Sequence, residues 1–309
     1  MLKLGVLGAS RIFRRVVVQP GLVQVVAVAS RSLERARFAV RDLPGARAVA
    51  GYDELLAADD VEAVYMALPP GLHATWAEKA AAAGKHVLVE KPLALTVGEV
   101  DRIEAAARGR NVTVLEAMPL DFHPWPTALA EPGPVQSLEC RMSFGEPPED
   151  SYRRALSQGG GIFWDAAPYF AALVDLAFHR PQLVRVRSRG WGAISFESEV
   201  ELDGGRRATL NCAFGGSHAA VVRATGPAGE VMHQSFLRPV TGAFRVNLHH
   251  IGTTGARMTI SFPPSSYVET QLAAFLRACG RGFDQEAMGR ARWRTALLEA
   301  LWRAAEGAP

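Results

Sequence analysis

Hydrophobic and polar positions follow one pattern in the first 118 residues of this chain and another pattern after them. In residues 1–118, short runs rich in Val, Leu and Ala alternate with longer segments whose apolar positions recur every three or four residues. Short runs that are apolar on both faces are typical of buried parallel strands, and the longer pattern predicts helices. Their strict alternation predicts an α/β domain with a doubly wound parallel sheet. The predicted strands are KLGVLG, VQVVAVAS, ARAVA, VEAVYMALP, HVLVE and VTVLEA.

The second pattern begins after the proline-rich stretch LDFHPWP. Segments such as FESEVEL, RRATLNCAF, HAAVVRATG and ARMTISF alternate apolar and polar residues between Gly-rich turns, which predicts antiparallel strands. Helical patterns cover GIFWDAAPYFAALVDLAF, Ser266–Cys279 and Gln285–Ala305. We therefore expect an α+β domain over residues 119–309 with a large, mainly antiparallel open sheet. Its last helices are expected to pack back on the first domain.

Length and charge narrow the possible classes of function. The 309 residues suffice for two domains, each with a sizeable core. The 34 basic and 31 acidic residues leave a net charge of +3, and no block of like charges forms a basic arm, so we expect no nucleic-acid partner. The densest basic stretch, Arg290–Arg294, has helical spacing and predicts a solvated or interdomain face.

The cysteines and the N-terminus indicate the compartment. Cys140, Cys212 and Cys279 are odd in number, far apart and without CxxC spacing, so they predict neither a disulfide framework nor a zinc site. The adjacent His249 and His250 lie in a strand-like segment and point to opposite faces, so they cannot share a metal. The start of the chain lacks a signal-peptide pattern, and no segment reaches about 18 uninterrupted apolar residues. We expect a cytoplasmic protein with no metal and no membrane partner.

The turn after the first strand reads GVLGASRIFRR and keeps part of a dinucleotide-binding pattern. Gly8 takes the first position of G-x-G-x-x-G, whereas Ser10 and Phe13 occupy the second and third. Backbone N–H groups at a helix start can still bind phosphate without glycine. A plain strand-to-helix turn with no ligand is the alternative. The residues predicted to contact the cofactor here are Gly8, Ala9, Ser10, Arg11 and Ile12.

The end of the second strand indicates which dinucleotide binds. Binders of NAD place Asp or Glu there for the ribose 2′-OH, but this chain has Ser30, Arg31 and Arg35. A guanidinium group binds a 2′-phosphate that a carboxylate would repel, so these residues predict NADP (NADPH). Alternatively, the two arginines are simply exposed residues at a helix start.

Two further groups of residues carry chemistry. Glu90 and Lys91 follow the run HVLV, where a buried parallel strand ends, and Pro92 removes a backbone donor and ends that strand. Asp165 and Tyr169 are four residues apart in an apolar helical pattern, so they share one helix face. The glycines of GGG just before that helix allow its backbone to approach a cofactor closely. Without further context, an exposed ion pair and a core tyrosine are the alternatives.

Several motifs together resemble one enzyme family. GVLGASRI, ASRS, ALPPGLHATWAEKAAAAGKHVLVEKPLALT, EAMPLDFHP and GGGIFWDAAPY occur in the order and spacing of the glucose-fructose oxidoreductase, inositol dehydrogenase and dihydrodiol dehydrogenase (Gfo/Idh/MocA) family. The resemblance covers nearly the whole chain and is strongest with the nucleotide-sugar ketoreductase branch. It implies an N-terminal Rossmann domain, a substrate domain that builds a homodimer or homotetramer through its open sheet, and hydride transfer between NAD(P) and a carbonyl or alcohol, usually on a sugar.

The resemblance also implies roles for individual residues. Lys91 matches the active-site lysine of the family and Tyr169 its proton donor, with Asp165 beside it. Glu90 is expected to anchor Lys91 or contact the nicotinamide side. A lysine at a strand's carboxyl end can stabilise charge on a substrate oxygen and lower the pKa of a phenol that gives up its proton. The resemblance further places Leu68, Pro69 and His73 beside the cofactor, although a position at a helix start explains His73 equally well.

Departures from the family pattern keep the substrate open. Pro70, Ala167 and Asp121 stand where relatives usually have Asn, Gly and Arg. The main hypothesis is an NADP-dependent oxidoreductase acting on a sugar or a nucleotide-linked keto-sugar. An imine or pigment reductase on the same fold, or a catalytically weak NADP-binding sensor, remains an alternative. For the expected oligomer, we predict that apolar side chains of ATLNCAF and AAVVRAT lie on the free face of the second sheet.

Overall fold

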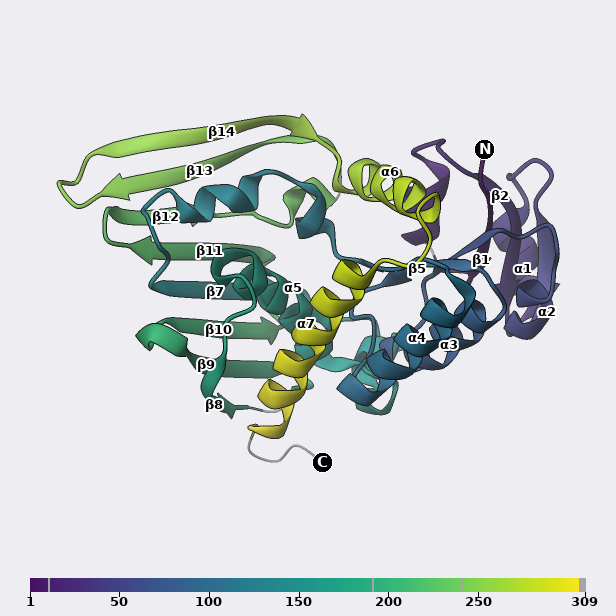
Figure 1. Cartoon of the computed structure of the whole chain (residues 1–309), viewed down its shortest axis with the longest axis horizontal. Helices are drawn as coiled ribbons and strands as arrows, with labels where there is room; N and C mark the ends of the chain where they lie inside the picture. The colour runs from purple at the N-terminus through teal and green to yellow at the C-terminus, as the bar shows by residue number, and fades with distance from the viewer. Residues whose placement is uncertain (11, 191, 241, 306–309) are drawn as a thin grey trace. The chain divides into compact units, whose positions relative to one another are not determined.

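The computed structural model describes residues 1–10, 12–190, 192–240 and 242–305, which form two compact units (Figure 1). Unit 1 combines Met1–Met118 with Val268–Thr295. Unit 2 combines Pro119–Tyr267 with Ala296–Pro309. The chain therefore leaves unit 1 after Met118 and returns to it for 28 residues before it ends in unit 2.

Unit 1 is built on a six-stranded parallel sheet in the order β3-β2-β1-β4-β5-β6. All six strands match predicted apolar runs, because residues that are apolar on both faces are stable only between two helical layers. The order reverses between β1 and β4, which is the switch point of a doubly wound sheet. The strands are β1 (Lys3–Leu7), β2 (Gln24–Ser30), β3 (Arg47–Ala50), β4 (Ala63–Met66), β5 (His86–Glu90) and β6 (Val114–Ala117).

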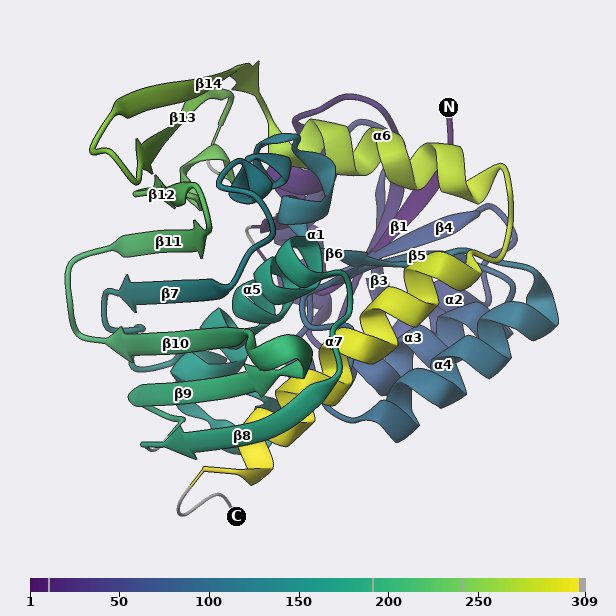
Figure 2. The ribbon, with the colours of Figure 1, turned by 60° about the vertical axis from the view of Figure 1, so that its left-hand side comes forward.

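Helices cover both faces of this sheet and bury it (Figure 2). On one face, side chains of α2, α3, α4 and the start of α7 form a core with the strands, and on the other face the layer comprises η1, α1 and α6. After β1 the chain forms a short π-type segment rather than a regular helix. The elements are η1 (Arg14–Val18), α1 (Leu33–Val40), α2 (Tyr52–Leu56), η2 (Pro70–Leu72), α3 (His73–Ala82), α4 (Val97–Arg110), α6 (Tyr267–Cys279) and α7 (Gln285–Arg303).

Unit 2 contains an eight-stranded sheet in the order β14-β13-β12-β11-β7-β10-β9-β8. Every neighbouring pair is antiparallel except β7 and β10, which run parallel. The sheet is therefore mainly antiparallel, as predicted. The strands are β7 (Ser137–Phe144), β8 (Leu183–Arg189), β9 (Ser195–Leu202), β10 (Arg207–Phe214), β11 (Ala219–Gly226), β12 (Gly229–His233), β13 (Phe244–Gly252) and β14 (Arg257–Ser265).

One face of this sheet packs on α5 (Gly161–Phe178). Among the described helices, α5 alone has the length and apolarity of a membrane span, and 83% of it is buried inside the protein. Phe163 and Trp164 of α5 pack against Trp302 at the end of α7, with ring centroids 5.0 Å and 5.6 Å apart. The short segments on this side are η3 (Pro119–Phe122), η4 (Trp125–Ala130), η5 (Tyr152–Arg154) and η6 (Leu156–Gln158).

The other face of the sheet is polar and charged, which corrects the prediction of an apolar free face. The strand residues of ATLNCAF and AAVVRAT alternate, and their apolar members Leu210 and Val222 point into the core. Their neighbours Asn211 and Arg223 lie on the free face. Period-two alternation puts most of the apolar side chains of these two strands on the covered face, while Val221 remains on the free face among polar neighbours.

Candidate active site

The first part of the candidate site lies at the carboxyl edge of the sheet in unit 1. Gly8 follows β1 with φ +101°, and a Cβ at this position would lie 2.6 Å from the carbonyl oxygen of Ala67. Its N–H donates to Ala29 O at 3.0 Å. Glycine is required here because the turns after β1 and β4 approach each other at the switch point, where dinucleotides bind in such sheets.

The residues after Gly8 offer polar groups at this edge. Ala9, Ser10 and Ile12 are half-buried, and Arg11 lies outside the described residues. The buried hydroxyl oxygen of Ser10 has no hydrogen-bond partner among the described residues. A buried hydroxyl at the switch point fits a cofactor oxygen as its partner, since such groups are normally paired.

Two arginines gather at the end of β2. Ser30 ends the strand and is 8% exposed, whereas Arg31 and Arg35 are exposed. Burial raises the pKa of Tyr52 on α2, while the charges of Arg31 and Arg35 and a hydrogen bond with Arg31 lower it. Both guanidinium groups therefore lie close to one phenol, and no carboxylate stands among the last residues of β2. This arrangement fits the 2′-phosphate of NADP.

His73 links the segments that follow β4 and β5 through hydrogen bonds. Its Nδ1 lies 2.7 Å from Pro92 O and its Nε2 lies 2.8 Å from Leu68 O, and the side chain is 0% exposed. A neutral ring has one N–H and donates to one of these carbonyls. Burial lowers the pKa of His73, although both carbonyl partners raise it. His73 therefore supports the turns that contain Leu68 and Pro92, and its place beside the cofactor stays a prediction.

Lys91 directly follows β5, as predicted, and is half-buried. The Lys91–Pro92 peptide bond is cis. The next residue, Leu93, donates its N–H to Glu116 Oε1 at 3.0 Å, and Arg294 lies 3.7 Å from the other oxygen of Glu116. The side chain of Arg294 is 3% exposed, so of the predicted solvated or interdomain face at residues 290–294, this residue is not solvated. The carbonyl and the N–H of the Pro92–Leu93 peptide group thus both have partners.

Glu90 at the end of β5 forms a partly buried pair with Tyr65. The Tyr65 hydroxyl donates to Glu90 Oε1, and Tyr65 is 0% exposed on neighbouring β4. Burial raises the pKa of Glu90, while the hydrogen bond from Tyr65 and the charges of Lys91 and Arg15 lower it. Glu90 is therefore anchored to the sheet and interacts electrostatically with Lys91, which fits the expected anchoring role.

The second part of the candidate site lies in unit 2. Asp165 and Tyr169 share one face of α5, and Tyr169 is 8% exposed. Oδ2 of Asp165 lies 3.2 Å from Nε of Arg153 on η5. The ring of Phe236 packs edge-on against Tyr169 at 6.5 Å between centroids. Tyr169 is thus a phenol in mostly apolar surroundings with a charged pair beside it.

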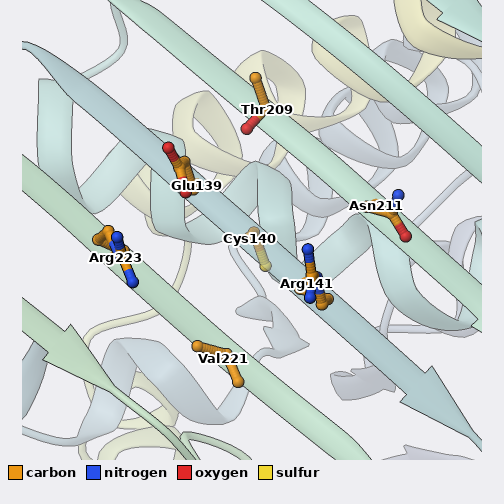
Figure 3. Close-up of a pocket in the computed structure, with 7 residues that line it drawn as sticks. All are labelled: Glu139, Cys140, Arg141, Thr209, Asn211, Val221 and Arg223. Atoms are coloured by element: carbon orange, nitrogen blue, oxygen red, sulfur yellow. The ribbon is translucent and has the colours of Figure 1, made fainter.

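A separate hollow lies on the free face of the unit 2 sheet and does not belong to this site. Figure 3 shows the residues that line this hollow, which lies across strands β7, β10 and β11. Its volume is about 260 Å³. Its exposed lining combines Glu139, Arg141 and Arg223 with neutral side chains, on the face opposite to α5. Opposite charges line it together, so it does not favour one charged ligand.

Three residues of the site were not predicted from the sequence. Tyr52, Tyr65 and Arg153 contact Arg31, Glu90 and Asp165 respectively. The sequence does contain an indication for Tyr65: it is a residue with a hydroxyl group in an otherwise apolar buried strand, and a buried hydroxyl needs a hydrogen-bond partner. For Tyr52 and Arg153 no local pattern specifies the contact. No group of three or more His, Cys, Asp or Glu in the described part of the chain could hold a metal ion.

The sheet order, its switch point and the residues at its carboxyl edge are those of a dinucleotide-binding domain. The family model described as "Oxidoreductase family, NAD-binding Rossmann fold" matches residues 2–118. The chain belongs to this family, Gfo/Idh/MocA, as predicted. Its members among the relatives are reductases and dehydrogenases, and this chain is an oxidoreductase.

Individual relatives extend the likeness over the whole chain. A dTDP-3,4-didehydro-2,6-dideoxy-alpha-D-glucose 3-reductase from Saccharopolyspora spinosa is 31% identical and aligns with 93% of this chain and 90% of its own length. The Streptomyces antibioticus protein of the same name is 33% identical over 91% of this chain and 89% of its own length. A crystal structure of a 3-ketoreductase from Actinomadura kijaniata, in complex with NADP and TDP-benzene, has a TM-score of 0.91 at 25% identity and covers 99% of this chain and 98% of that chain. These findings confirm the predicted fold.

Proposed function

We propose that this protein is an NADPH-dependent reductase of a keto group on a nucleotide-linked sugar. The observation that carries the proposal is the similarity of about nine-tenths of the chain to dTDP-keto-sugar 3-reductases. Lys91 at the end of β5 and the Asp165 and Tyr169 pair on α5 supply the chemistry that such a reduction needs. Residues 1–118 bind the cofactor, and the unit 2 sheet with α5 forms the substrate domain.

Each residue has a separate task in this proposal. Bound NADPH supplies the hydride. Tyr169 donates the proton to the substrate oxygen, because negative charge forms there when the carbonyl carbon is reduced. Lys91 stabilises that charge and lowers the pKa of the phenol. Glu90 keeps Lys91 at the edge of the sheet through its bond with Tyr65.

The residues at the end of β2 favour NADP(H) over NAD(H) as the cofactor. Arg31 and Arg35 are exposed there, where a binder of NAD would carry a carboxylate. We expect NADP(H) to bind at least tenfold more tightly than NAD(H), and Arg31→Asp to erase or reverse this preference, a cost of roughly 1.4 kcal/mol or more. Calorimetric titration of both cofactors measures it. Arg37→Asp, at an exposed site further along α1, is the matched control and should leave the preference unchanged.

The activity itself is tested by a screen of NADPH oxidation. dTDP-linked keto-sugars, the corresponding free keto-sugars and cyclic imines are offered at equal concentration. We expect turnover with a dTDP-linked keto-sugar and much weaker turnover with the free sugars. Turnover of imines alone would favour the imine-reductase alternative. Tight NADPH binding without turnover of any carbonyl compound would favour a sensor and contradict the proposal.

We also propose that the protein forms a dimer or tetramer through the free face of the unit 2 sheet. That face has rows of opposite charge, with Arg187 and Arg189 of β8 in register with Glu199 and Glu197 of β9. Such a surface supports a polar interface, in which charge complementarity sets the register. Light scattering at micromolar concentration is expected to exceed the 33.3 kDa of one chain. A 33.3 kDa particle would contradict assembly.

A further inference from the structure

A cation in unit 2 lies beside the proposed acid. Arg153 on η5 contacts Asp165 through Nε, and its side chain is 46% exposed, whereas that of Asp165 is 13% exposed. Because Asp165 and Tyr169 are four residues apart on α5, a group bound to one of them lies on the face of the other. The guanidinium group of Arg153 therefore borders the same helix face as the phenol.

The position of Arg153 is fixed by a close contact between main-chain atoms. The N–H of Gly160 donates to Ala155 O at 3.0 Å. A Cβ on Gly160 would lie 2.3 Å from Tyr152 O and 2.7 Å from Ala155 O. The segment from Tyr152 to Ala155 thus packs directly on the backbone at the start of α5. This contact brings Arg153 over the first turns of the helix, where Asp165 lies.

The electrostatic surroundings agree with this geometry. Burial lowers the pKa of Arg153, and the negative charges of Asp165, Tyr152 and Tyr169 raise it above its usual range. The neighbouring Arg154 instead forms an ion pair with Glu146, with 3.4 Å between Nη2 and Oε2. Two adjacent arginines of nearly equal exposure thus have different partners, and Arg153 is the one that interacts with the proposed acid.

Other titratable side chains lie near α5, among them His123 and His233, whose pKa values burial lowers to about 4, so both rings are neutral near pH 7. Asp121 lies on η3, and the free thiols of Cys140 and Cys212 lie on the covered side of the sheet. Tyr267 interacts electrostatically with Tyr169, which raises the pKa of Tyr267 together with the larger effect of burial. These groups are neutral or negative. Arg153 is thus a cation placed to counter a negative charge on Tyr169.

We propose that Arg153 is a positioning residue of the active site, which orients Asp165 and stabilises the tyrosinate that Tyr169 becomes; this rests on the proposed reduction. In that step the hydride adds to the carbonyl carbon and the π-electron pair moves to the oxygen. The phenol O–H bond breaks as a new O–H bond forms on the substrate. The negative charge left on Tyr169 then lies in apolar surroundings, where a nearby cation has a larger effect than in water.

The test is the ionisation of Tyr169 in the substrate-free enzyme. The chain has five tyrosines, so protein labelled with ¹³C at the tyrosine Cζ gives a small set of NMR signals, and Tyr169→Phe identifies the one that matters. We expect Arg153→Gln to raise the midpoint of Tyr169 ionisation by about one pH unit, the lower end for loss of a nearby opposite charge. Arg153→Lys should restore most of the shift. Arg154→Gln, with equal loss of charge, should leave the midpoint unchanged.

Two outcomes would overturn the proposal. One is the same midpoint in Arg153→Gln and in the unchanged protein, and the other is an equal shift in Arg154→Gln. A phenol that stays protonated up to the pH of unfolding in the unchanged protein also counts against it. The titration needs no substrate, so it can succeed or fail independently of the NADPH screen. With a substrate in hand, the basic limb of the kcat profile should move by the same amount in Arg153→Gln.

Discussion

At the scale of single residues, the proposed mechanism depends on a cation at a strand end, Lys91, and a phenol on a helix, Tyr169. Pro92 O lies 2.7 Å from a His73 nitrogen, and Leu93 N–H donates to Glu116, so both polar groups of the peptide that follows Pro92 have partners. These two hydrogen bonds fix the main chain directly after Lys91. In the proposed mechanism, the lysine acts on substrate charge without large rearrangement, which is what preorganised electrostatics requires.

The mechanism predicts the cost of losing either group. Tyr169→Phe should reduce turnover by about 10² to 10⁴, as for a lost general acid, with NADPH affinity nearly unchanged. Lys91→Met should have a similar effect, and the double variant should be little worse than either single variant because the two groups act as a unit. Asp165→Asn should give a milder loss. Steady-state rates and thermal melts measure these effects.

The control for the lysine is close in sequence. Lys85 precedes β5 and donates to Ala58 O at 2.8 Å, away from the carboxyl edge. Lys85→Met should leave turnover unchanged. Near-native turnover in Tyr169→Phe would refute the mechanism, since a tyrosine that only fills the core would change stability and not rate.

At the scale of elements, the junction between η5 and α5 decides where the unit 2 part of the site lies. The three glycines before α5 were expected to let its backbone approach the cofactor. In the structure, Gly160 and Gly161 approach carbonyl oxygens of the chain itself, those of Tyr152 and Gly192. A Cβ on Gly161 would lie 2.4 Å from Gly192 O. These glycines therefore permit close packing of neighbouring segments of unit 2.

Gly160→Ala tests this junction. The added methyl group must displace η5, and overpacking of this kind costs about 1 to 3 kcal/mol. We expect a lower melting temperature and reduced turnover, because Arg153 moves with η5. Gly98→Ala is the control: on α4 the new Cβ meets nothing within 4 Å, and alanine should raise stability by about 0.5 to 1 kcal/mol. Equal melting temperatures in the two variants would contradict the assigned contact.

Most helices and strands could be predicted from the sequence, but the pairing of strands and the contacts between elements could not. The strands of unit 1 and helices α3, α4 and α5 were predictable because their hydrophobic periodicity is local. The parallel pairing of β7 with β10 was not, since alternation specifies which face is buried but not which strand is the neighbour. Lys91, Asp165 and Tyr169 were proposed as site residues from short motifs, and their roles stay predictions. Arg153 was missed because its contact with Asp165 depends on tertiary packing.

At the scale of the whole molecule, unit 2 contains two buried histidines that predict acid sensitivity. His123 Nδ1 accepts from Trp125 N at 3.1 Å, and His233 Nδ1 faces Ser235 N at 3.5 Å. Their Nε2 atoms are buried without a partner among the described residues. Burial lowers the pKa of His123 to about 4, and burial with the charges of His123 and His249 lowers that of His233 to about 4.

The free energy of unfolding falls with decreasing pH because the unfolded chain binds protons at these histidines at a higher pH than the folded chain does. The unfolded chain protonates these histidines near pH 6.5, and the folded chain does so near 4. Stability is therefore full above about pH 6.5 and falls as the pH drops toward 4, by roughly 3 kcal/mol for each histidine. Melting temperatures between pH 7 and pH 4 should show a smaller fall in the variant with His123→Gln and His233→Gln.

Glutamine keeps an acceptor for the main-chain N–H groups but does not titrate in this range. His179→Asn at the exposed end of α5 removes a histidine without changing the buried pair, and its acid limb should match the unchanged protein. If the double glutamine variant lost stability with pH as steeply as the unchanged protein, other groups would be responsible for the acid sensitivity.

The return of residues 268–295 to unit 1 has a consequence for synthesis on the ribosome. The parallel sheet is complete at residue 117, but Leu272 and Phe275 of α6 and Met288 and Ala291 of α7 belong to its two cores. At roughly 5 to 20 residues per second, the nascent sheet waits on the order of ten seconds or more for them. Unit 2 is likewise incomplete until Trp302 is synthesised, because this residue packs against Phe163 of α5. Neither half is finished until α7 emerges, so a polypeptide released early contains no complete domain and exposes apolar surface to chaperones or proteases.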